Sequence, residues 1–68
     1  MSNHVNSDRL AHSVEQGRRR IGVSRQTYYN LINAGKLRTF KVGDRRLTSE
    51  DALEECIRLL EAEEEARK

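Results

Sequence analysis

Residues 23–37, VSRQTYYNLINAGKL, carry the signals that decide the fold. Ser24 is a favourable helix N-cap, because its hydroxyl can accept a backbone N–H from the first turn. Apolar side chains then recur at the i, i+3, i+4 spacing of an amphipathic helix: Tyr28, Leu31 and Ile32. Gly35 readily adopts the left-handed conformation that ends helices. We therefore predict a short helix over residues 25–34 with one buried face.

The opposite face of this helix is polar and holds no acidic residue. It offers Arg25, Gln26, Thr27, Tyr29, Asn30 and Asn33. In a DNA major groove, amide side chains pair with adenine and guanidinium groups with guanine. We expect Arg25, Gln26 and Asn30 to contact base edges, and Thr27 and Tyr29 to contact phosphates. The alternative is an ordinary solvated helix surface.

Charge is divided unevenly along the chain. Residues 9–46 contain ten basic and two acidic side chains, a net charge of +8. Residues 47–68 contain three basic and eight acidic ones, a net charge of −5. The first part suits a polyanion such as DNA and the second avoids one, unless the segregation is chance.

Length and composition exclude several classes of protein. A chain of 68 residues predicts one small domain. Its single cysteine, Cys56, permits no internal disulfide and fits a reducing compartment, so we expect a cytoplasmic protein. His4, His12 and Cys56 lack metal-ligand spacing, and no glycine-rich phosphate loop is present. We expect no catalytic residue, metal, cofactor or membrane segment.

The N-terminal part predicts a flexible segment over residues 1–12 and then a first helix. Ser13 and Gln16 form a capping-box pattern that starts a helix over residues 14–21. Gly22 would end it and open a short turn into the next helix. Gly17 costs about 1 kcal/mol within a helix unless close helix approach requires it.

After Gly35 the pattern alternates and predicts two strands, residues 37–42 and 45–48. Gly43 and Asp44 would join them in a type II′ turn.

This register sets Phe40 opposite Leu47 on the inner face, and Lys41 opposite Arg46 on the outer face. Opposed like charges destabilise a hairpin, so the second pair calls for an anion such as phosphate. The basic residues expected at the DNA backbone or minor groove are Lys36, Arg38, Lys41, Arg45 and Arg46.

A last helix is predicted over residues 49–66, capped by Thr48 with Asp51. Its apolar stripe would contain Leu53, Cys56, Ile57 and Leu60, flanked by Ala52 and Leu59. The acidic end beyond Leu60 would meet a basic surface on a partner protein or on a neighbouring copy, or remain a solvated helix end. The expected fold is mainly α with a small β-hairpin, a winged helix-turn-helix over residues 13–68 with an acidic C-terminal helix.

Over about residues 13–60, the chain resembles the small phage excisionases, recombination directionality factors of the MerR-like winged-helix class. The likeness to mycobacteriophage excisionases is close. Its motifs are Gly22-Val23-Ser24, Thr27 to Tyr29, Gly35-Lys36-Leu37, and Val42-Gly43 with Arg45-Arg46. The resemblance implies binding and bending of attachment-site DNA, cooperation with a tyrosine-type integrase, and neighbouring copies on the DNA.

The first helix departs from this family, since Gly17, Arg18 and Arg20 stand where small apolar residues and a leucine are usual. Either this helix packs loosely, or Arg18, Arg19 and Arg20 reach the DNA backbone. Two other functions stay open. A winged-helix transcription regulator would use the same groove chemistry, and a protein-interaction adaptor would show no DNA sequence preference.

Overall fold

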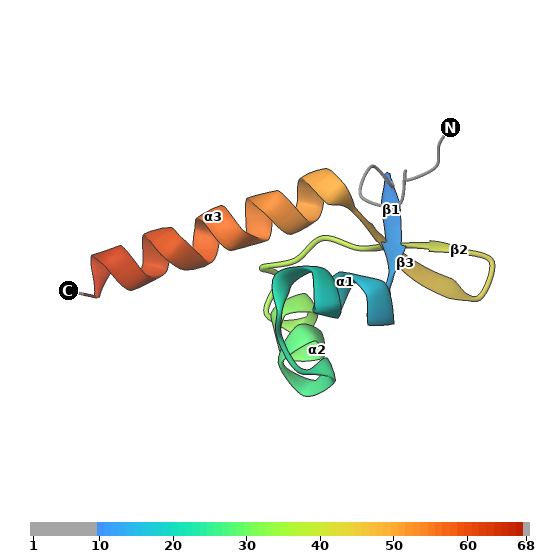
Figure 1. The fold of residues 1–68 in the computed structure, drawn as a ribbon, viewed down its shortest axis with the longest axis horizontal. Helices are drawn as coiled ribbons and strands as arrows, with labels where there is room; N and C mark the ends of the chain where they lie inside the picture. The colour runs from blue at the N-terminus through green and yellow to red at the C-terminus, as the bar shows by residue number, and fades with distance from the viewer. Residues whose placement is uncertain (1–9, 68) are drawn as a thin grey trace.

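The computed structural model describes residues 10–67, in which three helices lie to one side of a small sheet (Figure 1). The helices are α1 (Val14–Ile21), α2 (Arg25–Asn33) and α3 (Glu50–Ala66). The strands β1 (Ala11–Ser13), β2 (Phe40–Val42) and β3 (Arg45–Ser49) form an antiparallel sheet in the order β1-β3-β2. We call the β2–β3 hairpin the wing. The fold is the expected winged helix-turn-helix.

The helix-turn-helix unit follows its capping signals. The Ser13 hydroxyl accepts the Gln16 N–H at 3.2 Å, and the Gln16 side chain accepts the Ser13 N–H at 2.9 Å. Gly22, with φ of 77°, ends α1, and the Ser24 hydroxyl accepts the Thr27 N–H at the start of α2. The predicted bounds of α1 are confirmed, and α2 ends one residue earlier than predicted.

Gly17 is where α1 and α2 meet. A Cβ at this position would lie 2.2 Å from the Tyr28 hydroxyl oxygen, so only glycine lets the two helices approach so closely. Tyr28 is 1% exposed, and burial raises the pKa of its hydroxyl to about 12. The core consists of Tyr28, Leu31, Leu37, Ala52, Leu53 and Cys56.

Strand β1 corrects the prediction of a flexible segment over residues 1–12, of which residues 1–9 lie outside the described part. Ala11 pairs with Ser49 and His12 with Thr48, and the Leu10 carbonyl accepts the Glu50 N–H at 3.0 Å. The strand's partner lies 34 or more residues away along the chain, so local periodicity gave no sign of it.

The predicted register of the wing is confirmed, but its two faces are reversed. Phe40 pairs with Leu47 and Lys41 with Arg46. Phe40 is 44% exposed, whereas Thr48, which shares a face of β3 with Arg46, is fully buried. The Lys41–Arg46 pair therefore lies on the face toward the helices.

The start of β2 differs from the prediction, whereas the backbone at the Gly43-Asp44 turn agrees with it. Strand β2 begins at Phe40 rather than at residue 37, because Leu37 turns into the core and is 2% exposed. Gly43 has φ of 62° and Asp44 does not have a positive φ, as a type II′ turn requires.

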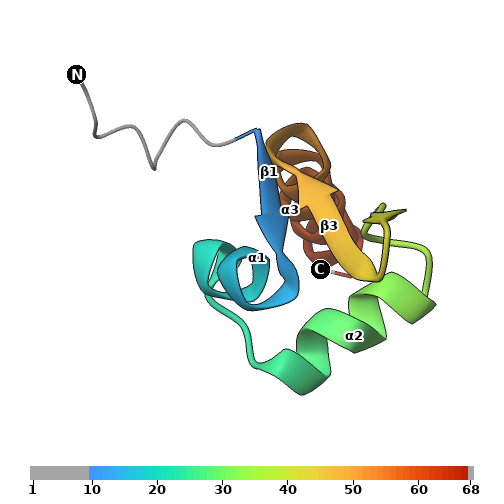
Figure 2. The ribbon, with the colours of Figure 1, turned by 90° about the vertical axis from the view of Figure 1, so that its right-hand side faces the viewer.

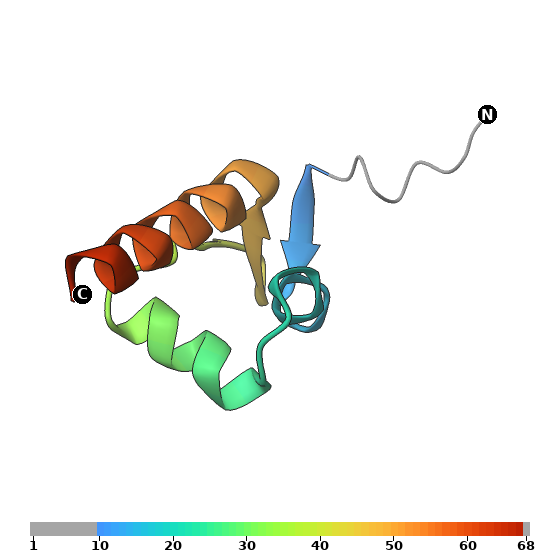
Figure 3. The same cartoon turned by 60° about the vertical axis from the view of Figure 1, so that its left-hand side comes forward.

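Helix α3 begins one residue later than predicted. Ser49 caps it by accepting the Ala52 N–H at 3.0 Å, whereas the Thr48 hydroxyl donates to the Arg38 carbonyl at 2.7 Å. Thr48 is thus a buried anchor for the chain leading into β2, and not the cap. Figure 3 shows α3 passing over α2, where apolar side chains of both helices form the core.

Candidate nucleic-acid interface

A polar hollow of about 410 Å³ lies between the start of α1, the first half of α2 and the wing. Figure 2 views the molecule from the wing side, with α1 and α2 beside and below the sheet. The hollow is lined by Ser13, Val14, Glu15, Arg25, Tyr29, Lys41, Asp44, Arg45 and Arg46. Five of the predicted contact residues therefore meet at one surface: Arg25, Tyr29, Lys41, Arg45 and Arg46.

Helix α2 presents its polar side chains in two rows. Arg25 lies over the Tyr29 ring, with its guanidinium carbon 5.8 Å from the ring centroid, and this row faces the wing. In the next row, the Gln26 amide donates to the Asn30 side-chain oxygen at 3.2 Å. Both amides are exposed and lie outside the hollow. Their mutual hydrogen bond aligns the Gln26 and Asn30 amides, the two candidate base-reading groups of this row, on the same exposed face of α2.

The remaining candidates on α2 lie at its two ends. The Thr27 side chain accepts a hydrogen bond from the Ser24 hydroxyl at 3.0 Å and remains exposed. Asn33 is exposed at the last residue of α2.

The wing contributes a concentrated positive charge. Lys41 and Arg46 are directly opposed, and both line the hollow. Arg46 is fixed by a hydrogen bond from its Nη1 to the Thr39 hydroxyl at 2.6 Å. Arg45 is exposed beside the turn. Opposed cations held this close favour an anion between or above them.

Three other residues that were predicted to contact DNA form ion pairs with acidic residues of helix α3 instead. Lys36 pairs with Glu63 at 2.9 Å, Arg38 with Glu55 at 2.8 Å and Arg20 with Glu50 at 2.6 Å. Lys36 and Arg38 also precede β2, so they lie outside the hairpin whose basic residues the sequence analysis grouped them with. The structure does not bring these three residues to the hollow.

Glu15 is an interface residue that the sequence analysis missed. Its carboxylate contacts Arg18, Arg19 and Arg25, and the hydrogen bond from Arg18 holds the pKa of Glu15 below its usual value. The spacing to Arg18 and Arg19 is visible in the sequence as i, i+3 and i, i+4 pairs. The link to Arg25 appears only when α1 and α2 are placed together.

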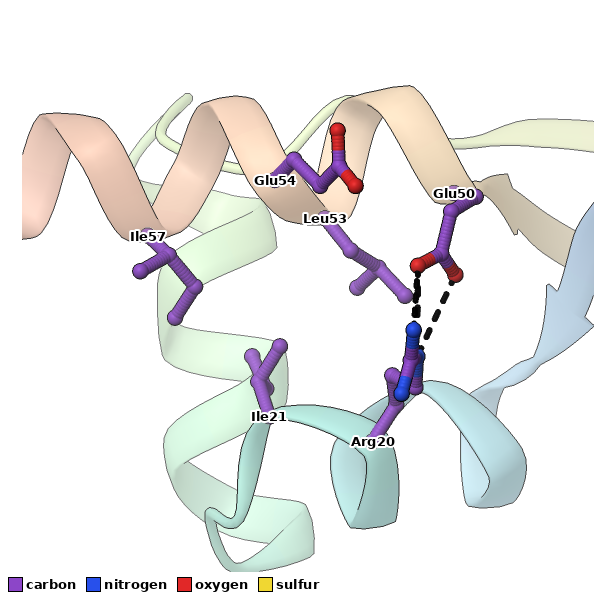
Figure 4. Close-up of a pocket in the computed structure, with 6 residues that line it drawn as sticks. All are labelled: Arg20, Ile21, Glu50, Leu53, Glu54 and Ile57. Atoms are coloured by element: carbon purple, nitrogen blue, oxygen red, sulfur yellow. Dashed lines mark hydrogen bonds and ion pairs between the residues drawn. The ribbon is translucent and has the colours of Figure 1, made fainter. Parts of the chain in front are cut away.

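A second cluster that sequence reasoning missed joins β1, α1 and α3. Buried His12 lies 2.7 Å from Glu50 through its Nε2, and Arg20 donates to the same carboxylate. These hydrogen bonds lower the pKa of Glu50, with Arg20 the larger cause. Figure 4 shows the Arg20–Glu50 pair at the edge of a 160 Å³ hollow beside Ile21 and Leu53. The cluster lies outside the polar hollow and links β1, α1 and α3.

Within residues 10–67, no three or more His, Cys, Asp or Glu side chains form a group that could hold a metal ion. Cys56 is buried, and burial raises the pKa of its thiol. In the same part of the chain, every helix is too short or too polar to cross a membrane.

Comparison with known families agrees with this geometry. The family model of the helix-turn-helix domain matches residues 13–58, from the capping box of α1 into the middle of α3. That family includes excisionase-like DNA-binding proteins. No curated protein and no solved structure matches the chain. Because the matched region covers more than half of the sequence, the chain belongs to the helix-turn-helix domain family of DNA-binding proteins.

Proposed function

We propose that this protein is an excisionase, a sequence-specific DNA-binding and DNA-bending factor that directs an integrase toward prophage excision. One observation carries the DNA-binding part of the proposal. Arg25 and Tyr29 of α2 line the same hollow as Lys41, Arg45 and Arg46 of the wing. A helix and a basic hairpin on one surface can contact adjacent grooves of one duplex.

In the proposed complex, α2 enters the major groove and the wing lies along the neighbouring minor groove. Arg25, Gln26 and Asn30 contact base edges, because guanidinium and amide groups form paired hydrogen bonds there. Thr27, Tyr29 and Asn33 hold α2 in place. A phosphate, or the negative potential of a narrow minor groove, relieves the repulsion between Lys41 and Arg46.

The excisionase role rests on the sequence motifs and on the division of charge. The Gly22-Val23-Ser24 turn, the helix ending at Gly35 and the Val42-Gly43 wing tip resemble that family. A protein that engages two grooves at once gains contacts when the duplex bends toward it, which repays the deformation energy. The proposed partners are attachment-site DNA, a tyrosine-type integrase and neighbouring copies on the DNA, in the bacterial cytoplasm.

The acidic end of α3 is the proposed contact for a basic protein surface. Its carboxylates beyond Leu60 repel DNA, and Glu63 is already paired with Lys36. A chain truncated after Leu60 should bind single DNA sites as before and lose integrase recruitment. Unchanged recruitment of integrase would mean that the acidic end of α3 is only a solvated helix end.

The decisive experiment selects binding sites from randomised duplexes and then measures bending. The selected site is placed at different positions in fragments of equal length, and gel mobility is compared. The proposal predicts that a central site slows migration most, and that sites in phage attachment DNA occur in tandem. An isolated operator over a promoter with unbent DNA would instead indicate a transcription regulator, and no sequence preference would indicate an adaptor.

A further inference from the structure

Residues 9–46, the basic part of the chain, contain only two acidic residues, which are Glu15 and Asp44. Both line the hollow that is proposed to face DNA. A carboxylate at such a surface repels phosphate and lowers affinity for every duplex. Asp44 belongs to the wing's turn, where aspartate is a common residue. Glu15 lies in helix α1 and not in a turn, so turn geometry does not explain why this residue is acidic.

Glu15 binds three arginines at once. Its Oε1 accepts from Arg18 Nε at 3.1 Å and lies 3.3 Å from Arg25 Nη1, and its Oε2 lies 3.1 Å from Arg19 Nε. The Arg25 guanidinium also lies over the Tyr29 ring. Arg25 is therefore held from two sides, by a carboxylate and by an aromatic face, although 62% of its side chain is exposed.

Helix stability explains only part of this arrangement. An acid in the first turn favours the helix dipole, and pairs at i, i+3 and i, i+4 stabilise an exposed helix by a few tenths of a kcal/mol. Those effects account for the ion pairs of Glu15 with Arg18 and Arg19. They do not account for its contact with Arg25, which starts the next helix and is itself a candidate for contact with a base edge.

We propose that Glu15 is a specificity-determining positioning residue for DNA recognition, which rests on the function proposed above. It orients Arg25 before DNA arrives, so less side-chain freedom is lost when Arg25 meets a guanine edge. It also competes with phosphates for Arg18 and Arg19, which keeps binding to unrelated sequences weak. Glu15 thus lowers total affinity and raises discrimination.

The test compares Glu15→Gln with Glu61→Gln, which makes the same change of charge on α3. The probes are a duplex selected by the unaltered chain and a random-sequence duplex of the same length. Glu15→Gln should bind the random duplex roughly 3–10-fold more tightly at 50 mM salt, with a salt slope steeper by about 0.9. Its preference for the selected duplex should fall, whereas Glu61→Gln should change both affinities equally and slightly.

Glu15→Asp separates positioning from charge, since it keeps the carboxylate but shortens its reach. It should lose part of the preference for the selected duplex without a steeper salt slope. In an Arg25→Ala background, Glu15→Gln should alter the preference less than in the unaltered chain, because only the competition for Arg18 and Arg19 remains. Thermal unfolding first establishes that each variant is folded.

Equal effects of Glu15→Gln and Glu61→Gln on both duplexes would overturn the proposal and assign Glu15 to helix stability. An unaltered chain that selects no sequence would overturn the proposed function as well. The two failures are distinguishable, because the first leaves the DNA preference of the unaltered chain intact.

Discussion

Strand β3 belongs to the wing and leads directly into helix α3, but the wing and α3 have opposite properties. The wing carries Lys41, Arg45 and Arg46, is largely exposed and projects from the body, whereas α3 buries three residues against the core (Figure 1). The acidic C-terminal end of α3 points away from the wing. The comparison teaches that one short strand connects an exposed, basic surface to an element that packs into the core. Changes on one side should leave the property of the other side unaltered.

The largest expected effect is a loss of stability when a buried side chain of α3 is shortened. Leu53→Ala removes a side chain that is 1% exposed and should lower the free energy of unfolding by about 2–5 kcal/mol, through lost burial and a residual cavity. Leu59→Ala, on the same helix but 40% exposed, should change it by less than about 0.5 kcal/mol. Urea unfolding followed by circular dichroism measures both. Equal effects would mean that α3 does not anchor the domain.

A smaller loss of stability is expected at the contact between α1 and α2. Gly17→Ala gains up to about 1 kcal/mol in helix propensity, but its Cβ would overlap the buried Tyr28 hydroxyl, and overpacking costs about 1–3 kcal/mol. The net result should be a lower midpoint of urea unfolding. Adding Tyr28→Phe, which removes the hydroxyl, should restore part of the loss. A Gly17→Ala chain as stable as the original would show that the helices can separate at no cost.

The sequence was sufficient wherever the decisive interactions are local. The capping box of Ser13, the end of α1 at Gly22 and the register of the wing all depend on residues within a few positions of one another, and the structure has each of them. The faces of the wing could not be predicted, because an alternating strand does not say which side meets the helices. That side is fixed by Thr48, whose burial depends on the chain at Arg38.

Long-range contacts account for the other omissions. Strand β1 exists because His12 and Ala11 meet β3, and the His12–Glu50–Arg20 cluster joins three elements. For the candidate interface, the polar face of α2 and the basic wing could be predicted by residue type. Their shared hollow, the acid Glu15 within it and the diversion of Arg38 to Glu55 depend on tertiary geometry.

The smallest expected change in the free energy of unfolding concerns its dependence on pH through Glu50, at the start of α3. The pKa of Glu50 is lowered in the folded protein, so its ionised form adds stability above the unfolded-state pKa, and this is lost as pH falls through the folded value. Glu50→Gln should therefore reduce the free energy of unfolding near pH 7 by up to about 1 kcal/mol, and the difference should shrink below pH 4.5 and vanish once the pH is below the lowered folded-state pKa. A pH-independent difference would remove the Arg20 and His12 contacts from the account.

The central claim is that α2 and the wing, and not α3, form the surface that binds DNA. It is tested most directly by the salt dependence of binding to one duplex for Arg46→Ala and for Arg58→Ala, an exposed arginine of α3. The account predicts that Arg46→Ala flattens the slope by about 0.9, as one lost phosphate contact requires, and that Arg58→Ala leaves it unchanged. Equal slopes for the two variants, or a loss confined to Arg58→Ala, would contradict it.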